Sequence, residues 1–172
     1  MKNTSLFVAV VFMLAAGLFI ACSKNNDNTT TKLSIRLTDT PYNAQEVNID
    51  IQEVRVNLAD DSTGWISLPT NARVYNLLNF QNGIDTALAS GTVPTGNVRE
   101  LRFILGSNNT IKINNIVYPL TIPSGSESGL KIKIGKNLAA SFDSLVIDFD
   151  ANASIKQTGA GEYKLKPVLK LK

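Results

Sequence analysis

The chain has 172 residues, of which 44% are hydrophobic, and a formal net charge of +3 from 17 Lys and Arg against 14 Asp and Glu. This excess is too small to indicate a nucleic acid partner. The sequence has no His and a single Cys, which excludes a disulfide within the chain, a thiolate metal cluster and His-based catalysis. We therefore expect no cofactor and a fold held together by packing.

The first 21 residues are typical of a lipoprotein export signal. Lys2 supplies a positive start, and Leu6 to Ile20 is an unbroken apolar run that is shorter than the about 20 residues of a membrane span. Ala21 before Cys22 resembles the lipobox at which bacterial lipoproteins are cleaved and acylated on the new N-terminal Cys. We therefore expect residues 1–21 to be removed and Cys22 to carry lipid.

Residues 22–31 predict a flexible tether, because no apolar side chain follows the Cys before Lys32. Fully extended, the nine residues after the Cys reach roughly 30 Å. Ser23, in place of Asp after the Cys, resembles lipoproteins that are passed on to an outer membrane. The expected location is the outer membrane of a cell envelope, with the periplasmic and surface-facing orientations both open.

From Lys32 onward, apolar residues recur at every second position, which is typical of half-buried strands. Val47 to Leu58 predicts a long strand with a bulge at Gln52-Glu53, which would keep its β-branched residues on one face. Further strands are expected near residues 33–37, 65–68, 73–78, 101–105, 111–113, 116–118, 130–134, 145–149 and 163–171.

Three segments depart from this alternation. Gln81 to Gly91 has two apolar residues four apart and predicts a short helical turn, the one helix expected after the signal. Asn114-Asn115 predicts a two-residue hairpin turn, because Asn tolerates positive φ. Pro119 and Pro123 bracket Leu120 to Ile122, which predicts an edge strand or an irregular link.

About nine to ten short strands without a long crossover helix predict an all-β, antiparallel sandwich over residues 32–172. We expect one domain with one core, because a chain of this size hides about 68–70% of its unfolded surface on folding.

Several motifs occur in a characteristic order between Lys32 and Lys172. They are Leu37-Thr38-Asp39-Thr40-Pro41, Gly64-Trp65, Tyr75-Asn76-Leu77-Leu78, Gln81-Asn82-Gly83, Arg102-Phe103-Ile104-Leu105-Gly106, Pro123-Ser124-Gly125-Ser126, Gly129-Leu130-Lys131-Ile132, Asp148-Phe149-Asp150-Ala151 and Lys166-Pro167. This series resembles domain-of-unknown-function family 4382. The resemblance implies an exported, often lipid-anchored, all-β domain with an immunoglobulin- or prealbumin-like sandwich, and it implies no activity.

Asp148 and Asp150 flank Phe149, so in a strand both carboxylates would lie on one face about 7 Å apart, as an acid/base dyad or a calcium site requires. Asp39 could add a third oxygen donor. The alternative, that Asp150 ends the strand and caps the next turn, is favoured because Asp is a turn former. A carboxylate-based glycoside hydrolase stays open but less favoured, and we assign no catalytic or metal-binding residue.

Three other sets of side chains are candidates for binding. Trp65 and Tyr42, with other tyrosines, could stack on sugars, or Trp65 could belong to the core. Ser126 and Lys131 could form a Ser-Lys pair, or Ser126 could lie in a glycine-rich loop. A row of lysines could form an anion-binding patch on one sheet face, or a solvated face: Lys131, Lys133, Lys164, Lys166, Lys170 and Lys172.

Together these features predict a lipid-anchored envelope lipoprotein whose sandwich is a non-catalytic binding or accessory module. The expected partners are the membrane, through the N-terminal lipid, and a glycan or an envelope protein. The alternative is a structural or adhesion component of a surface assembly. Specific contacts are expected on the loops Thr38 to Tyr42, Asp60 to Gly64 and Ser124 to Gly129, because sandwiches present variable loops at their ends.

Overall fold

A computed structural model describes residues 29–58, 64–123, 129–139, 141–159 and 161–172. The expected signal peptide, Cys22, most of the tether, Ser126 and most of the loops at 60–64 and 124–129 lie outside these residues. The first strand begins at Thr30, so the last two residues assigned to the tether belong to a strand. In the described ranges, no helix has the length and apolar character to cross a membrane.

The described chain is all β, apart from two short helical segments. The strands are β1 (Thr30–Thr38), β2 (Glu46–Asn57), β3 (Trp65–Leu68), β4 (Arg73–Asn76), β5 (Thr86–Pro94), β6 (Gly96–Leu105), β7 (Thr110–Ile113), β8 (Ile116–Thr121), β9 (Leu130–Leu138), β10 (Phe142–Phe149), β11 (Ile155–Thr158), β12 (Glu162–Leu165) and β13 (Leu169–Leu171). The helical segments are the 3₁₀ helix η2 (Leu77–Phe80) and α2 (Ala151–Ser154).

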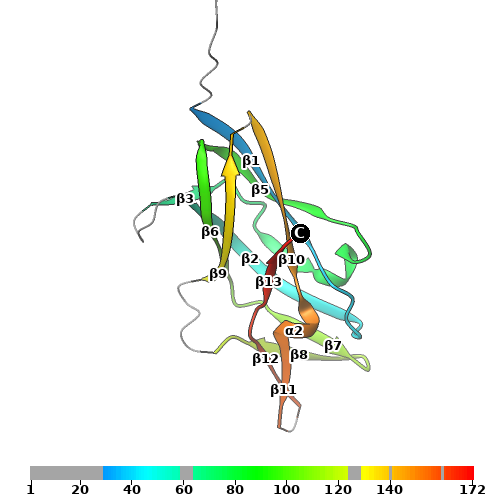
Figure 1. Ribbon diagram of the computed structural model, residues 1–172. Coiled ribbons are helices and arrows are strands. Elements are labelled where there is room, and N and C mark those ends of the chain that lie inside the picture. The colour runs from blue at the N-terminus through cyan, green and yellow to red at the C-terminus, as the bar shows by residue number, and fades with distance from the viewer. Residues whose placement is uncertain (1–28, 59–63, 124–128, 140, 160) are drawn as a thin grey trace, which may run out of the picture.

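The strands form two mixed sheets that pack against each other, which confirms the all-β sandwich (Figure 1). The smaller sheet has the order β13-β10-β1-β5, and the larger has the order β11-β12-β8-β7-β2-β6-β9, with β3 and β4 also paired to β2. The purely antiparallel expectation is wrong at two places, because β1 runs parallel to β10 and β8 runs parallel to β12. Alternating burial does not encode strand direction, so the sequence could not show this. The immunoglobulin- or prealbumin-like detail stays a prediction.

Strand β2 is the centre of the larger sheet. At Ile51 it pairs with Arg73 of β4 along one edge and with Leu105 of β6 along the other. The predicted bulge is confirmed, since the register with β6 shifts between Ile51 and Glu53. As a result, the apolar residues before and after the bulge face the same core and are fully buried: Val47, Ile49, Ile51, Val54 and Val56.

The core lies between the two sheets and draws on both. Strands β1, β5 and β10 contribute alternate residues from the smaller sheet, and β6 contributes them from the larger. Fully buried examples are Leu33, Ile35, Leu37, Leu88, Ile147, Phe149, Val98, Leu101 and Phe103. The alternation that predicted strands is therefore the alternation between this core and solvent.

The helical turn expected at Gln81 to Gly91 is wrong in position. A one-turn helix, η2, precedes that segment, and its first N–H groups are capped by Asn76, whose side chain accepts from Leu78 N at 3.3 Å. The segment itself leads into β5, which pairs along β1. The hydrogen bonds and packing along β1 stabilise this segment as a strand. Two apolar residues at helical spacing are too weak a local signal to make it a helix.

The single strand expected at 163–171 is also wrong. It divides into β12 and β13, which belong to different sheets, and Pro167 lies at the crossing because it cannot donate to a ladder. Ser154 stabilises the crossing. Its carbonyl accepts from Lys166 N at 2.8 Å, and its hydroxyl oxygen accepts from Val168 N at 2.7 Å.

The hairpin expected at Asn114-Asn115 is confirmed, and both residues have positive φ, +51° and +63°. Beyond it, Pro119 lies inside β8 and does not end it. Leu120 N donates to Asn109 O on the β7 side, so the nitrogen of Pro119 faces the opposite edge. Strand β12 covers that edge only at Leu120 and Thr121, so Pro119 removes no bond from the ladder.

The turn after β6 has no room for a side chain at Gly106. A Cβ atom built there would overlap the carboxylate of Asp50. That carboxylate is buried and accepts hydrogen bonds from Asn108 N at 3.2 Å and from Gln52 Nε2, while Asn109 Oδ1 accepts from Asp50 N at 2.9 Å. The carboxylate therefore cannot move aside without breaking the two hydrogen bonds that it accepts.

We predict that Gly106→Ala lowers the free energy of unfolding by about 1–3 kcal/mol, because the added methyl overfills this turn. Urea denaturation measures the loss. In an Asp50→Ala background, the same Gly106→Ala change should cost distinctly less, since the obstructing carboxylate is gone. Equal losses in the two backgrounds would show that Asp50 is not the obstacle.

Candidate binding site

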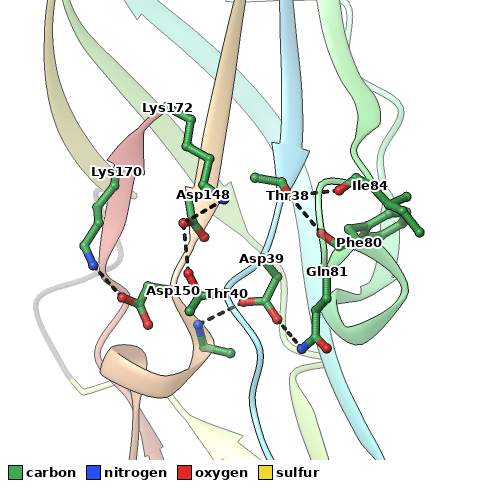
Figure 2. Close-up of polar contacts among 11 residues, drawn as sticks. Thr38, Asp39, Thr40, Phe80, Gln81, Ile84, Asp148, Asp150, Lys170 and Lys172 are labelled. Atoms are coloured by element: carbon green, nitrogen blue, oxygen red, sulfur yellow. Dashed lines mark hydrogen bonds and ion pairs between the residues drawn. The ribbon is translucent and has the colours of Figure 1, made fainter.

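The parallel pairing of β1 and β10 brings the ends of both strands to one place. Thr38, the last residue of β1, lies opposite Asp148 in β10. Figure 2 shows that Asp39, Asp148 and Asp150 converge there from segments far apart in the sequence. The three residues are almost completely buried, with 1%, 4% and 6% of their surface exposed, respectively. We call these three residues the aspartate clasp.

Asp150 follows β10 and caps α2. Its Oδ1 accepts from Ala153 N at 2.8 Å, and its Oδ2 accepts from Lys170 Nζ at 2.6 Å. The hydrogen bond from Lys170 is the main reason that the pKa of Asp150 is lowered, and the bond from Ala153 adds to it. The interpretation of Asp150 as a cap is confirmed, and its carboxylate has partners on both oxygens.

Asp148 pairs with Lys172, which directly follows β13. Its Oδ2 accepts from Thr40 Oγ1 at 2.9 Å and lies 3.5 Å from Lys172 Nζ. Its Oδ1 is buried and accepts no hydrogen bond from the described part of the chain. Together with Lys170 on Asp150, this pairing fastens the three-residue strand β13 to the end of β10 (Figure 2).

Asp39 joins β1 to two other segments. Its Oδ1 accepts from Ala151 N of α2 at 3.1 Å, and its Oδ2 accepts from Gln81 Nε2 at 3.0 Å. Burial raises the pKa of Asp39 above its ordinary value of 3.8, and the charge of Asp148 raises it further, although both hydrogen bonds oppose this. Next to it, Thr38 Oγ1 lies 2.8 Å from the carbonyl oxygens of Phe80 and Ile84.

These contacts show what the clasp does. It ties the end of β1 to the loop after η2, to α2 and to the C-terminal strand. Across the described ranges, no group of three or more Asp, Glu or Cys side chains is placed to hold a metal ion. The oxygen atoms proposed as calcium ligands or as an acid/base dyad are mostly engaged in internal hydrogen bonds and ion pairs, so we place the candidate site elsewhere.

Trp65 and Lys131 do not join the clasp. Trp65 is half-buried in β3, and the guanidinium of Arg102 lies 4.0 Å above the centre of its ring. Lys131 is exposed on β9, opposite Arg102 in the register. One face of Trp65 is therefore occupied by a cation from the same chain, and a sugar could not stack on that face.

The six lysines considered for an anion-binding patch do not share one sheet face, so the alternative of a patch is wrong. Strands β9 and β12 belong to opposite ends of the larger sheet order, and β13 belongs to the smaller sheet. Lys170 and Lys172 also pair with the clasp aspartates. The patch required these strands to be neighbours, and a period-two pattern shows neither which strands pair nor the crossing at Pro167.

Two tyrosines do come together, one on β8 and one on β12. The rings of Tyr118 and Tyr163 are 5.1 Å apart and tilted by 53°. Tyr42 approaches Tyr163 closely enough to interact electrostatically, and its pKa is raised by burial and then by that tyrosine. Trp65 has its ring covered by Arg102, whereas Tyr42 lies near the ring of Tyr163. Tyr42 is therefore the predicted binding residue that belongs to this aromatic group.

A pocket of about 380 Å³ opens beside Tyr163. Its lining residues are Pro119, Thr121, Gly161, Glu162 and Tyr163. We call this feature the tyrosine pocket. Its volume is within the range of small-ligand sites, and it combines an apolar wall with a hydroxyl and a carboxylate.

Sequence reasoning missed all the lining residues except Tyr163. They come from two strands that are distant in the sequence and meet only through the short parallel pairing of Leu120 and Thr121 with β12. The one local signal was the Gly159 to Gly161 turn, where Gly161 has φ +85° and a side chain would lie 3.7 Å from the Tyr118 ring.

The clasp predicts opposite pH effects for two of its members. The folded state binds the Asp39 proton more tightly than the unfolded chain, so Asp39 adds stability as the pH falls through its raised pKa. Asp150 has a lowered pKa, so its contribution is complete above 3.8 and disappears as the pH falls through the lowered value.

We therefore predict that Asp39→Asn makes the acid loss of stability steeper than in the wild type and that Asp150→Asn makes it shallower. Urea denaturation over a series from neutral to acidic pH measures both slopes. Three parallel curves would contradict the assigned protonation behaviour.

The comparisons with known proteins identify a family and no relative. Comparison with curated proteins and with solved structures finds no match for this chain. The family model of the domain of unknown function DUF4382 matches residues 30–167, which is nearly the whole sandwich. The chain therefore belongs to the DUF4382 family, as its motifs suggested.

Proposed function

We propose that this protein is a lipid-anchored lipoprotein of a bacterial outer membrane and that its sandwich is a non-catalytic binding module. The observation that carries the proposal is the position of the tyrosine pocket. Strands β8 and β12 lie at the end of the sandwich opposite to the start of β1 (Figure 1). A lipid on Cys22 would hold the start of β1 near the bilayer, so the tyrosine pocket would face away from it.

The chemistry of the tyrosine pocket suits a sugar. The C–H faces of a pyranose ring pack on apolar surfaces, and the exposed ring of Pro119 supplies such a surface beside the largely buried Tyr163. Sugar hydroxyls need hydrogen-bonding groups around that surface, and Thr121 and Glu162 supply these. Glu162 is exposed, so it can accept such bonds without a large cost of desolvation.

The aspartate clasp supports the non-catalytic part of the proposal. A glycoside hydrolase needs one carboxyl that donates a proton and one that attacks or activates water, with space for the substrate between them. In the clasp, Asp150 caps α2 and pairs with Lys170, while Asp148 pairs with Lys172. These carboxylates hold the fold together through hydrogen bonds and ion pairs.

A protein partner is the second candidate, and the hairpin between β7 and β8 favours it. Ile116 and Val117 are 54% and 59% exposed at this hairpin, which lies at the same end of the sandwich as the tyrosine pocket (Figure 1). Adjacent exposed apolar residues are typical of surfaces that contact another protein. An adhesion role in a surface assembly would use these residues.

For the sugar, we predict that Glu162→Gln and Thr121→Val, which change two lining residues of the tyrosine pocket, each abolish most of the binding that the wild-type domain shows on an array of envelope glycans. Both residues are at least partly exposed, so the fold should survive, and circular dichroism checks this. Glu100→Gln on β6 is the matched control and should bind normally. If all three variants keep the binding that the wild type shows, the tyrosine pocket is excluded as the sugar site.

The protein partner would then be tested by co-purification, in which the double variant Ile116→Ser and Val117→Ser is compared with the wild type.

For the anchor, we predict that cells expressing the full chain incorporate labelled palmitate into the protein and that Cys22→Ala abolishes the label. The wild type should fractionate with outer membranes, and the variant should not. An unlabelled wild-type protein would overturn the lipoprotein assignment while leaving the tyrosine pocket to be tested separately.

A further inference from the structure

An aromatic ring is exposed at the end of the sandwich where the chain enters it. Phe142, the first residue of β10, is 55% exposed. It lies opposite Lys32 in the parallel register, and Lys32 N donates to the carbonyl of the preceding Ser141 at 2.9 Å. Both side chains therefore project from the same face of neighbouring strands, with an apolar ring next to an ammonium group.

The described chain begins at this same end. Thr29 is the first described residue, and its carbonyl accepts from Thr95 N at 3.0 Å in the turn between β5 and β6. Lys136 of β9 is a second exposed ammonium group at this end, and Asp143 of β10, 3.8 Å away, balances its charge. We call Lys32, Lys136, Ser141 and Phe142 the entry face.

We propose that the entry face rests on the surface of the membrane that carries the lipid anchor. The Phe142 ring would lie in the interfacial layer, and the Lys32 ammonium would contact the phosphate groups of anionic lipids. Phe is among the residues that interfacial helices bury at the headgroup boundary, and a Lys near an anionic bilayer is attracted by its negative surface potential. The proposal rests on the proposed function, because it needs the N-terminal lipid.

The lipid anchor explains why so small a surface suffices. One ring and one or two lysines would bind a bilayer weakly if the domain were free in solution. The short segment between Cys22 and Thr30 would make the contact intramolecular, with a high effective concentration of membrane at the entry face. The weak contact would then fix the orientation of the sandwich relative to the bilayer, so that the tyrosine pocket points away from the membrane.

The test uses the complete lipidated protein in vesicles of phosphatidylethanolamine and phosphatidylglycerol. Acylation consumes the only native Cys, so an introduced Cys is the one free thiol. A polarity-sensitive fluorophore is placed on Ser141→Cys, beside Phe142, and separately on Val117→Cys, an exposed position at the opposite end. We expect a blue-shifted emission from position 141 and an emission typical of water from position 117.

Two further measurements make the result decisive. Adding Phe142→Ser to Ser141→Cys should abolish the blue shift, although flotation shows that the protein remains on the vesicles. A label at 141 that reports water on floating vesicles would overturn the inference and leave the lipid anchor intact. Failure to float would overturn the anchor itself. A blue shift that persists in the unlipidated Cys22→Ala protein without vesicles would assign the entry face to a second copy of the chain and would also overturn the inference.

Discussion

The parallel pairing of β1 with β10 is the constraint on which the rest of the structure depends. Because the two strands run in the same direction, their starts meet at one end of the sandwich and their ends meet at the aspartate clasp. Parallel neighbours need a long crossover, and here the chain from β2 to β9 supplies it, with every strand except β5 in the larger sheet. This one pairing therefore gives the module a polarity, with chain entry at one end and the β8–β12 pocket at the other.

The aspartate clasp connects the paired ends of β1 and β10 to the segments around them. Asp39 ties β1 to α2 and to the loop after η2, while Asp148 and Asp150 hold β13 through two lysines. Burying carboxylates carries a cost of desolvation that pairing offsets only in part. The clasp therefore determines where the C-terminal segment docks more than it adds to the free energy of unfolding. It also explains why three aspartates that resemble a calcium site have few oxygen atoms left for a ligand.

Features that local chemistry determines were predictable from the sequence. The bulge at Gln52-Glu53 follows from β-branched residues changing phase, and the turn at Asn114-Asn115 follows from the tolerance of Asn for positive φ. Features that depend on partners distant in the sequence were not predictable. They include the parallel pairs, the crossing at Pro167 and the pocket between β8 and β12. The convergence of Asp39 with Asp148 was foreseen as a possible set of ligands, but its engagement by Lys170 and Lys172 depends on a strand that the sequence pattern merged with its neighbour.

The most direct test of this account is a nuclear Overhauser spectrum of the isotope-labelled sandwich. The account predicts cross-strand contacts that rise together in number, from Leu33 with Asp143, through Ile35 with Leu145, to Leu37 with Ile147. Contacts in which the β10 residue number falls as the β1 number rises would show antiparallel pairing. In that case the clasp, the entry face and the polarity of the module would all be contradicted.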